Sequence, residues 1–335
     1  MPAPLALTMG EPAGIGGEIT LKSWLSRAEG VPPFFAIDNP ARLDALASAL
    51  KLPVALQEIS EPGEAASLFD TALPVLPLEL AAEAVPGKLD SANAGAVIES
   101  IKRAVQLTQS GAASAVVTNP IHKSALYAAG FAHPGHTEFL AELAGPGYRA
   151  VMMLASAELR VVPVTIHISL AEVARTLMPE EIIRCGRVTA QALARDFGVA
   201  NPRLAFAGLN PHAGEDGAMG AEEIEIITPA LEQLRAEGID ARGPLSADTL
   251  FHAAARKTYD AAICMFHDQA LIPIKTIDFD GGVNTTLGLP FVRTSPDHGT
   301  ALDIAGQGTA SETSLIAALR LAAEMAAKRA VWEAG

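Results

Sequence analysis

Short apolar runs alternate with longer amphipathic segments along this chain of 335 residues, and this alternation constrains its fold more than any other feature. Strands interleaved with helices are typical of a largely parallel sheet that is covered by helices, so the sequence predicts an α/β fold. The short runs predict buried strands at Leu5–Met9, Pro33–Ile37, Ala115–Thr118, Val151–Ala155, Arg160–Val164, Leu204–Ala207 and Ala261–Phe266. The longer segments predict helices at Ala92–Gln109, Pro179–Phe197, Ala221–Glu237 and Ser311–Ala330.

The composition excludes several classes of protein. Half of the residues are hydrophobic, which is enough for a sizeable core and excludes wholesale disorder. A formal net charge of −14 argues against nucleic acid as the main partner, because binding a polyphosphate needs a basic surface. The two cysteines, Cys185 and Cys264, form no CxxC pair. No signal peptide or long apolar stretch is evident, so we expect a cytoplasmic protein that does not contact a membrane.

Histidines occur where predicted strands end. His167 follows the strand VVPVTI, His212 lies in GLNPHAGEDG after the strand LAFA, and His267 follows AAICMF. The carboxyl ends of the strands form the edge of an α/β sheet where ligands bind. Three imidazoles from this edge could hold one divalent ion and leave a coordination position open for a substrate. The spacing is also compatible with three unrelated active-site or capping histidines.

Cationic and amide side chains lie in loops with apolar or glycine-rich surroundings. A cation in such a place needs a partner, and the phosphate or carboxylate of a ligand would supply one. A structural ion pair with a nearby aspartate is the alternative. The candidate anion-binding residues are Lys123, Lys275, Asn284 and Arg293, and the candidate ion-pair partners are Asp278, Asp280 and Asp297.

Two glycine-rich segments are candidates for binding a dinucleotide. MGEPAGIGGEI follows the first predicted strand, but it fails the GxGxxG pattern because Ile19 stands where the third glycine belongs. DHGTALDIAGQGTA at 297–310 is more distinctive. Its backbone amides could approach a pyrophosphate closely, and one of its acids could hold a ribose hydroxyl. By composition alone this segment is equally well explained as a flexible loop.

An ordered set of motifs resembles the 4-hydroxythreonine-4-phosphate dehydrogenase (PdxA) family, from residue 5 to about residue 325. The resemblance implies a fold similar to isocitrate and isopropylmalate dehydrogenases, with two α/β domains and the active site in the cleft between them. It further implies a terminal domain of residues 1–130 and 290–335, which carries the NAD loop. An inserted domain of residues 131–289 would carry the metal ligands and the dimer interface. The motifs are GEPAGIGGE, TNPIHK, GHTEFLA, LNPHAGEDGAMGAEE, GPLSADTLF, HDQALIPIKT and GGVNTTLGLPFVRTSPDHGTALDIAGQG.

The resemblance also implies a set of site residues, each matched by its motif. The implied ligands of one divalent ion (Zn, Co, Mn or Mg) are His167, His212 and His267. The implied substrate contacts are His136, Thr137, Lys275, Asn284 and Arg293. The implied contacts to NAD, or to NADP, are His298, Gly299, Thr300 and Asp303. The candidates for the proton-transfer group of catalysis are Lys275 and Asp248.

The activity implied by this family is the NAD-dependent oxidation of 4-phosphooxy-L-threonine at C3. Decarboxylation to 3-amino-2-oxopropyl phosphate follows, within vitamin B6 biosynthesis, in a homodimer whose active site lies at the subunit interface. The alternatives are a paralogous dehydrogenase of D-threonate or D-erythronate 4-phosphate, a phosphate-binding acyltransferase and a non-catalytic binding module. The chain departs from the family at Gly17, where the family more often has a proline. We expect this glycine to loosen the first turn of a helix, because proline is favoured there.

Overall fold

The computed structural model describes residues 2–133 and 135–335, which divide into two compact units. The first unit comprises Met1–Ala150 and Leu289–Ala327, and the second comprises Val151–Gly288 and Lys328–Gly335. These boundaries differ from the predicted 1–130, 131–289 and 290–335. Residues 131–150 belong to the first unit because α6 (His136–Ala144) packs against α4 (Ala94–Gln109). The last eight residues belong to the second unit, where Arg329 pairs with Asp196.

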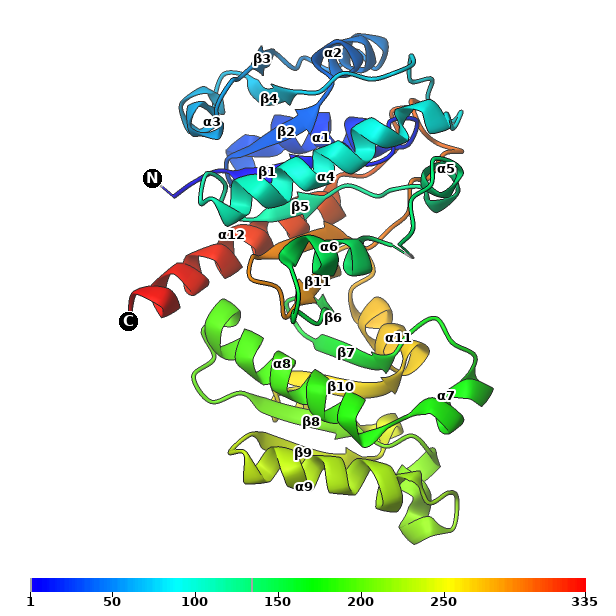
Figure 1. Cartoon of the computed structure of the whole chain (residues 1–335). Helices are drawn as coiled ribbons and strands as arrows, with labels where there is room; N and C mark the ends of the chain where they lie inside the picture. The colour runs from blue at the N-terminus through cyan, green and yellow to red at the C-terminus, as the bar shows by residue number, and fades with distance from the viewer. Residues whose placement is uncertain (1, 134) are drawn as a thin grey trace. The chain divides into compact units, whose positions relative to one another are not determined.

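The first unit contains a parallel sheet with the strand order β3-β4-β2-β1-β5-β12. Its central strands are fully buried, as expected for a parallel sheet covered by helices. The strands are β1 (Leu5–Thr8), β2 (Phe34–Asp38), β3 (Leu56–Glu58), β4 (Leu73–Pro77), β5 (Val116–Thr118) and β12 (Arg293–Pro296). The helices, visible in Figure 1, are α1 (Gly16–Leu25), α2 (Pro40–Ala49), α3 (Ala65–Leu68), α4, α5 (Lys123–Ala128), α6 and α12 (Thr313–Ala334).

Helix α4 packs along β1, β2 and β5 because one of its faces is apolar. Val97, Ile101 and Val105 lie four residues apart and are buried, which is a spacing typical of a helix that packs on a sheet. The order of the strands changes direction at β1, because β2 pairs with one edge of β1 and β5, which comes later in the chain, pairs with the other edge. The carboxyl ends of β1 and β5 therefore flank the point where an open α/β sheet binds ligands.

The second unit contains a mixed sheet with the strand order β11-β6-β7-β10-β8-β9. Strands β7, β10, β8 and β9 are parallel, whereas β6 runs antiparallel to both β7 and β11. The strands are β6 (Val151–Ala155), β7 (Arg160–Thr165), β8 (Arg203–Ala207), β9 (Asp240–Leu245), β10 (Ala261–Phe266) and β11 (Val283–Leu287). The helices are α7 (Leu170–Thr176), α8 (Pro179–Phe197), α9 (Thr228–Ala236), α10 (Ala253–Arg256) and α11 (His267–Ile277).

Helix α8 shows how sequence sets the position of an element in this unit. Pro179 occupies its first turn, Glu180 and Glu181 follow there, and Gly198 ends it in a left-handed conformation with φ 71°. Its buried face packs against the sheet and against α9. In place of a single helix at Ala221–Glu237, the structure has a π-helical turn at Glu223–Ile227 that leads into α9.

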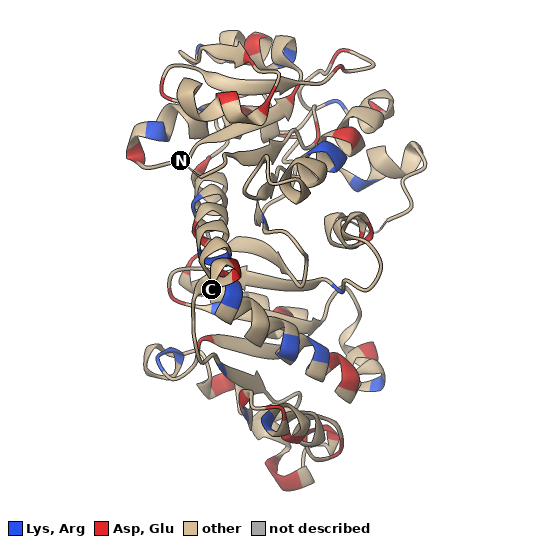
Figure 2. Ribbon diagram, turned by 60° about the vertical axis from the view of Figure 1, so that its left-hand side comes forward, with Lys and Arg blue, Asp and Glu red and all other residues tan. Residues whose placement is uncertain are grey.

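Two features of the helices bear on possible partners: their length and apolar character, and the distribution of their charged residues. Among the described residues, no helix is both long and apolar enough to cross a bilayer. In the view of Figure 2, Lys and Arg are interspersed with Asp and Glu along the helices.

Candidate active site

Arg293 is a buried cation at the edge of the sheet in the first unit. It is the first residue of β12, it is 3% exposed, and its Nη2 donates to the Thr118 hydroxyl oxygen at 2.6 Å. Thr118 is the last residue of β5, the strand that pairs with β12. Burial lowers the pKa of the guanidinium to about 10, so the group remains charged at neutral pH. A cation held in this way favours an anionic ligand, because water cannot screen it there.

His136 lies near Arg293 and is held in its neutral form. It begins α6, and burial lowers its pKa well below the usual value, with a further contribution from the charge of Arg293. Its Nε2 is shielded from solvent and has no hydrogen-bond partner among the described residues. Thr137 follows in the first turn of α6, where backbone N–H groups lack partners within the helix. A ligand oxygen would satisfy these groups.

The glycine-rich loop follows β12 and is anchored to α1. Ile15 N donates to Thr300 O at 3.0 Å, and a side chain at Gly14 would come 2.9 Å from the same oxygen. Asp303 is exposed, whereas the Nε2 of His298 is buried without a hydrogen-bond partner among the described residues. The segment at 297–310 is therefore an ordered loop whose position is fixed by backbone contacts.

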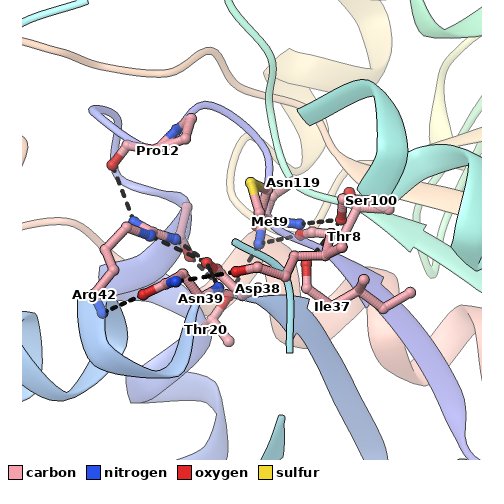
Figure 3. Close-up of polar contacts among 12 residues, drawn as sticks. Thr8, Met9, Pro12, Thr20, Ile37, Asp38, Asn39, Arg42, Ser100 and Asn119 are labelled. Carbon is pink, nitrogen blue, oxygen red and sulfur yellow. Dashed lines mark hydrogen bonds and ion pairs between the residues drawn. The ribbon is translucent and has the colours of Figure 1, made fainter. Parts of the chain in front are cut away.

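Sequence reasoning did not assign two polar residues at the ends of β1 and β5. Asn119 donates from Nδ2 to Thr8 O and to Thr20 Oγ1, each at 3.0 Å, and Figure 3 shows it bridging these elements. Glu11 is 3% exposed, and burial raises its pKa although Ala13 N and the charges of His122 and Arg42 oppose the shift. The acidic residue of the motif GEPAG is the sequence signal that points to Glu11.

In the second unit, the structure brings His167 and His267 together. Their ring centroids are 5.9 Å apart, because β7 and β10 pair in parallel and each histidine follows its strand. The Nδ1 of His267 lies 2.7 Å from Asp268 Oδ1, which leaves Nε2 available to a ligand. A carboxylate on the second ring nitrogen is the usual support for a metal-binding imidazole.

His212 lies in a left-handed turn between β8 and the π-helical turn. The φ angles from His212 to Asp216 are all positive, from 43° to 80°, and only Gly214 adopts such values readily. Asn210, before this turn, is held by Glu223, whose carboxylate accepts from Asn210 N at 2.7 Å and from Asn210 Nδ2 at 2.9 Å. Backbone strain of this kind is concentrated at functional sites.

The three histidines do not form a complete metal centre in the described part of this single chain. There, no group of three His, Cys, Asp or Glu residues is placed to hold an ion. The pair of His167 and His267 fits two of the expected ligands, because the rings are adjacent and the tautomer of His267 is fixed by Asp268. Metal ligation by His212 stays a prediction, as does the metal itself.

Comparison with known proteins identifies the family of this chain. The family described as "Pyridoxal phosphate biosynthetic protein PdxA" matches residues 32–322. The chain belongs to this family. A 4-hydroxythreonine-4-phosphate dehydrogenase of Methylorubrum populi is 59% identical over 334 residues, with coverage of 98% of this chain and 95% of the relative. Another, from Bradyrhizobium diazoefficiens, is 55% identical, with coverage of 97% and 98%.

A solved structure supports the same assignment to the PdxA family. The crystal structure of 4-hydroxythreonine-4-phosphate dehydrogenase from Klebsiella pneumoniae has a TM-score of 0.88 at 38% identity, with coverage of 97% of this chain and 99% of that one. The predicted α/β fold class is therefore confirmed. At Gly17 of this PdxA family member, a side chain would come 2.9 Å from Arg42 Nη1 and from Leu46 Cδ2, which are the ends of two side chains of α2.

The remaining expected residues of the PdxA family site lie in the second unit. Lys275 is in the last turn of α11, with Nζ 5.6 Å from the ring centroid of Phe279. Asn284 is half-buried on β11. Asp248 is exposed, and the hydroxyl of Ser246 and the charge of His212 lower its pKa. The two candidates for proton transfer, Lys275 and Asp248, thus both lie in the second unit.

Proposed function

We propose that this chain catalyses the NAD-dependent oxidation of 4-phosphooxy-L-threonine at C3 and the decarboxylation that yields 3-amino-2-oxopropyl phosphate. The reaction belongs to pyridoxal 5'-phosphate biosynthesis, in the cytoplasm where the dinucleotide is available. Membership of the PdxA family supports this proposal. The decisive observation within the chain is the buried charge of Arg293 beside the neutral ring of His136, a pair suited to an anionic substrate.

The residues of the first unit bind and orient the substrate. Arg293 neutralises one anionic end, and its donation to Thr118 fixes the plane of the guanidinium. The neutral ring of His136 adds no charge of its own, so the positive charge of Arg293 can attract an anionic group of the substrate. Orientation of this kind can lower a reaction barrier by roughly 7–11 kcal/mol in ideal cases.

Two absent groups would complete the chemistry. NAD would accept the hydride from C3, and the loop with His298, Gly299, Thr300 and Asp303 would hold it. A divalent ion held by His167, His212 and His267 would act as a Lewis acid that lowers the pKa of the alcohol to be oxidised. Imidazole ligands favour zinc or cobalt over magnesium. Lys275 is the residue proposed to take the hydroxyl proton.

We further propose a homodimer whose active site lies at the subunit interface. Its support is a group of large apolar side chains that are exposed on the second unit, several of them next to the expected ligands. A monomeric protein rarely leaves such a group uncovered. They are Ile168 at 45% exposure, Leu170 at 66%, Ile272 at 63% and Phe279 at 73%.

One experiment tests the proposed reaction directly. The purified protein is mixed with 4-phosphooxy-L-threonine, NAD and a divalent ion, and NADH absorbance and carbon dioxide release are followed together. We expect one carbon dioxide for each NADH. D-Threonate 4-phosphate and D-erythronate 4-phosphate serve as comparison substrates, and we expect both to react far more slowly. NADH formed only with the sugar acids, or with none of the three, would refute the assignment.

A further inference from the structure

Lys123 is a cation of the first unit that has no role in the site described so far. It is the first residue of α5, in the segment that follows β5. A side chain at Gly135 would come 3.7 Å from Cε and 3.9 Å from Nζ of Lys123. Gly135 directly precedes His136, the first residue of α6. The ammonium group of Lys123 therefore lies beside the N-terminus of α6.

No partner within the described chain explains the position of Lys123. Among the residues that the structure describes, its ammonium group forms neither an ion pair nor a hydrogen bond. The carboxylate of Glu138 lies 3.6 Å from the same side-chain position at Gly135, but it is not paired with Lys123. A lysine in the first turn of a helix is electrostatically unfavourable, because the N-terminus of a helix carries a partial positive charge. The stability of α5 therefore does not explain this lysine either.

The start of α6 presents further groups that an anion would satisfy. The Nε2 of His136 is buried and has no hydrogen-bond partner among the described residues. Within α6, Phe139 N donates to Gly135 O at 3.3 Å, so the N–H groups of the three preceding residues have no partner in the helix. The charge of Arg293 also acts here, since it contributes to the lowered pKa of His136. Lys123 and Arg293 thus both place positive charge near the start of α6.

The charge of a phosphate group decides whether one cation is enough. A phosphate monoester carries a charge of about −1.5 to −2 at pH 7, which exceeds that of a carboxylate. Arg293 supplies one positive charge, and the ring of His136 is neutral because burial lowers its pKa. Lys123 supplies the second charge. Its side chain is exposed and flexible, so the ammonium group can move onto an anion that binds at α6.

We propose that Lys123 binds the phosphate group of the substrate, together with Arg293 and the N-terminus of α6, and selects phosphorylated over unphosphorylated substrates. The proposal rests on the proposed function, because it takes a phosphate monoester as the ligand. Lys123 contacts the substrate directly, since Nζ donates a charge-assisted hydrogen bond to a phosphate oxygen. A ligand that lacks the phosphate makes no such contact, and its affinity does not depend on Lys123.

The test compares ligands with and without a phosphate. Lys123→Met removes the charge and keeps an apolar stem, whereas Lys123→Arg keeps the charge. Lys102→Met is the matched control, because Lys102 is exposed on α4 of the same unit. The binding of inorganic phosphate, 4-phosphooxy-L-threonine and 4-hydroxy-L-threonine to the full chain is measured by calorimetry without NAD.

We expect Lys123→Met to raise the Kd of inorganic phosphate and of 4-phosphooxy-L-threonine by about ten- to a hundredfold. The Kd of 4-hydroxy-L-threonine should not change. Lys123→Arg should recover most of the loss, and Lys102→Met should change none of the three values. In steady-state kinetics, the KM of the phosphorylated substrate should rise in Lys123→Met while the KM of NAD stays the same.

Two results would overturn the role of Lys123. One is a folded Lys123→Met protein with wild-type affinity for inorganic phosphate and for the phosphorylated substrate. The other is an equal loss of affinity for 4-hydroxy-L-threonine, because Lys123 would then support α6 or bind another part of the ligand. Lys123→Gln replaces Lys123→Met if that protein does not fold.

A further variant separates ligand binding from a structural pairing with Glu138. If Lys123 served as the partner of this carboxylate, Glu138→Gln would weaken phosphate binding as much as Lys123→Met does. We expect Glu138→Gln not to weaken it, since the change removes a negative charge near the anion. Absence of NADH formation by the wild-type protein, with phosphate binding that Lys123→Met weakens, refutes the proposed reaction alone.

Discussion

Arg293 on β12 donates through Nη2 and Nε to the hydroxyl oxygen of Thr118 on β5, at 2.6 and 3.2 Å, in the buried interior of the first unit. The hydroxyl fixes the guanidinium but carries no charge, so the positive charge is not neutralised by this contact. A guanidinium at the ligand-binding edge of the sheet is suited to an anionic group that arrives from solution.

Substitutions at these two residues should affect substrate binding in different degrees. Arg293→Ala removes a charge-assisted hydrogen bond, which is worth about 1.5–3 kcal/mol, so the KM of the phosphorylated substrate should rise roughly tenfold to more than a hundredfold. Thr118→Val keeps the shape but frees the guanidinium, and the rise should be smaller. Steady-state kinetics measure both. An equal rise in the KM of NAD in Arg293→Ala would remove this residue from the substrate site.

The neutral state of His136 predicts a dependence of stability on pH. Its pKa in the folded chain lies well below the usual value, whereas in the unfolded chain it is about 6.5. The unfolded chain therefore takes up the proton first as the pH falls. The free energy of unfolding should decrease from about pH 7 downward, by up to about 1.4 kcal/mol per pH unit from this residue.

Urea unfolding of the wild type and of His136→Gln between pH 5 and pH 7 measures this effect. The amide side chain cannot titrate, so the variant should lose less stability than the wild type over the same range. Parallel curves for the two proteins would show that the ring of His136 is protonated normally in the folded chain.

The sequence predicted the elements whose pattern is local. Val151–Ala155, Ala261–Phe266 and Pro179–Phe197 agree with the structure to the residue, because each is a continuous apolar run or a strongly amphipathic helix with a proline start. It missed β3, β4, β9, β11 and β12. The residues of β9 and β11 are polar or only partly buried. The antiparallel course of β6 was also missed, since the direction of a strand depends on its partners and not on its own residues.

The site was predictable in its chemistry and less so in its geometry. Strand ends indicated that His167, His212 and His267 could converge; the rings of His167 and His267 are adjacent, whereas the convergence of His212 stays a prediction. The burial of Arg293 was not predictable, because it depends on the pairing of β12 with β5, 175 residues apart. The role of Asn119 in joining β1, β5 and α1 depends equally on contacts distant in sequence.

The proposed metal ligand His267 should depend on its neighbour. Asp268 accepts from, or shares a proton with, the Nδ1 of His267 at 2.7 Å, and loss of such a support usually costs 10- to 100-fold in metal affinity. We expect about that loss of zinc affinity in Asp268→Asn, measured by calorimetry with the metal alone. His212→Ala should abolish dependence on a divalent ion together with turnover. Full activity of His212→Ala after treatment with a chelator would exclude the metal role.

Among substitutions of a single carboxylate, the one at a buried ion pair in the second unit should reduce the stability of the folded chain the most. Asp196 is 1% exposed and accepts from Arg329 Nε at 2.7 Å and from Arg195 Nε at 2.8 Å. Burial alone would raise its pKa, but the two arginines outweigh burial and lower it. Its contribution to stability is therefore present above about pH 4, the unfolded value, and is lost as the pH falls through the lower folded value.

Asp196→Asn removes a buried carboxylate charge that two guanidinium groups contact, and it should cost about 3–5 kcal/mol at pH 7. Glu237→Gln is the matched control, because Glu237 pairs with Arg187 at the surface, where such a pair is worth about 0–1 kcal/mol. Chemical denaturation of the three proteins gives the comparison. A loss in Asp196→Asn no larger than in Glu237→Gln would contradict the importance of this pair.

Glu223 should control the position of His212 through the loop rather than by contact with a ligand. Its carboxylate is 3% exposed and accepts from both nitrogens of Asn210, and a side chain at Gly214 would come 2.6 Å from its Oε2. In Glu223→Gln, an NH2 group replaces one of the two carboxylate oxygens that accept from Asn210, so two donors face each other. This change should cost about 1.5–3 kcal/mol in stability. Zinc affinity should fall by about 10- to 100-fold as the left-handed turn relaxes. Glu225→Gln, an exposed neighbour with the same change of charge, should do neither, and equal zinc affinity in the two variants would show that the turn holds His212 without Glu223.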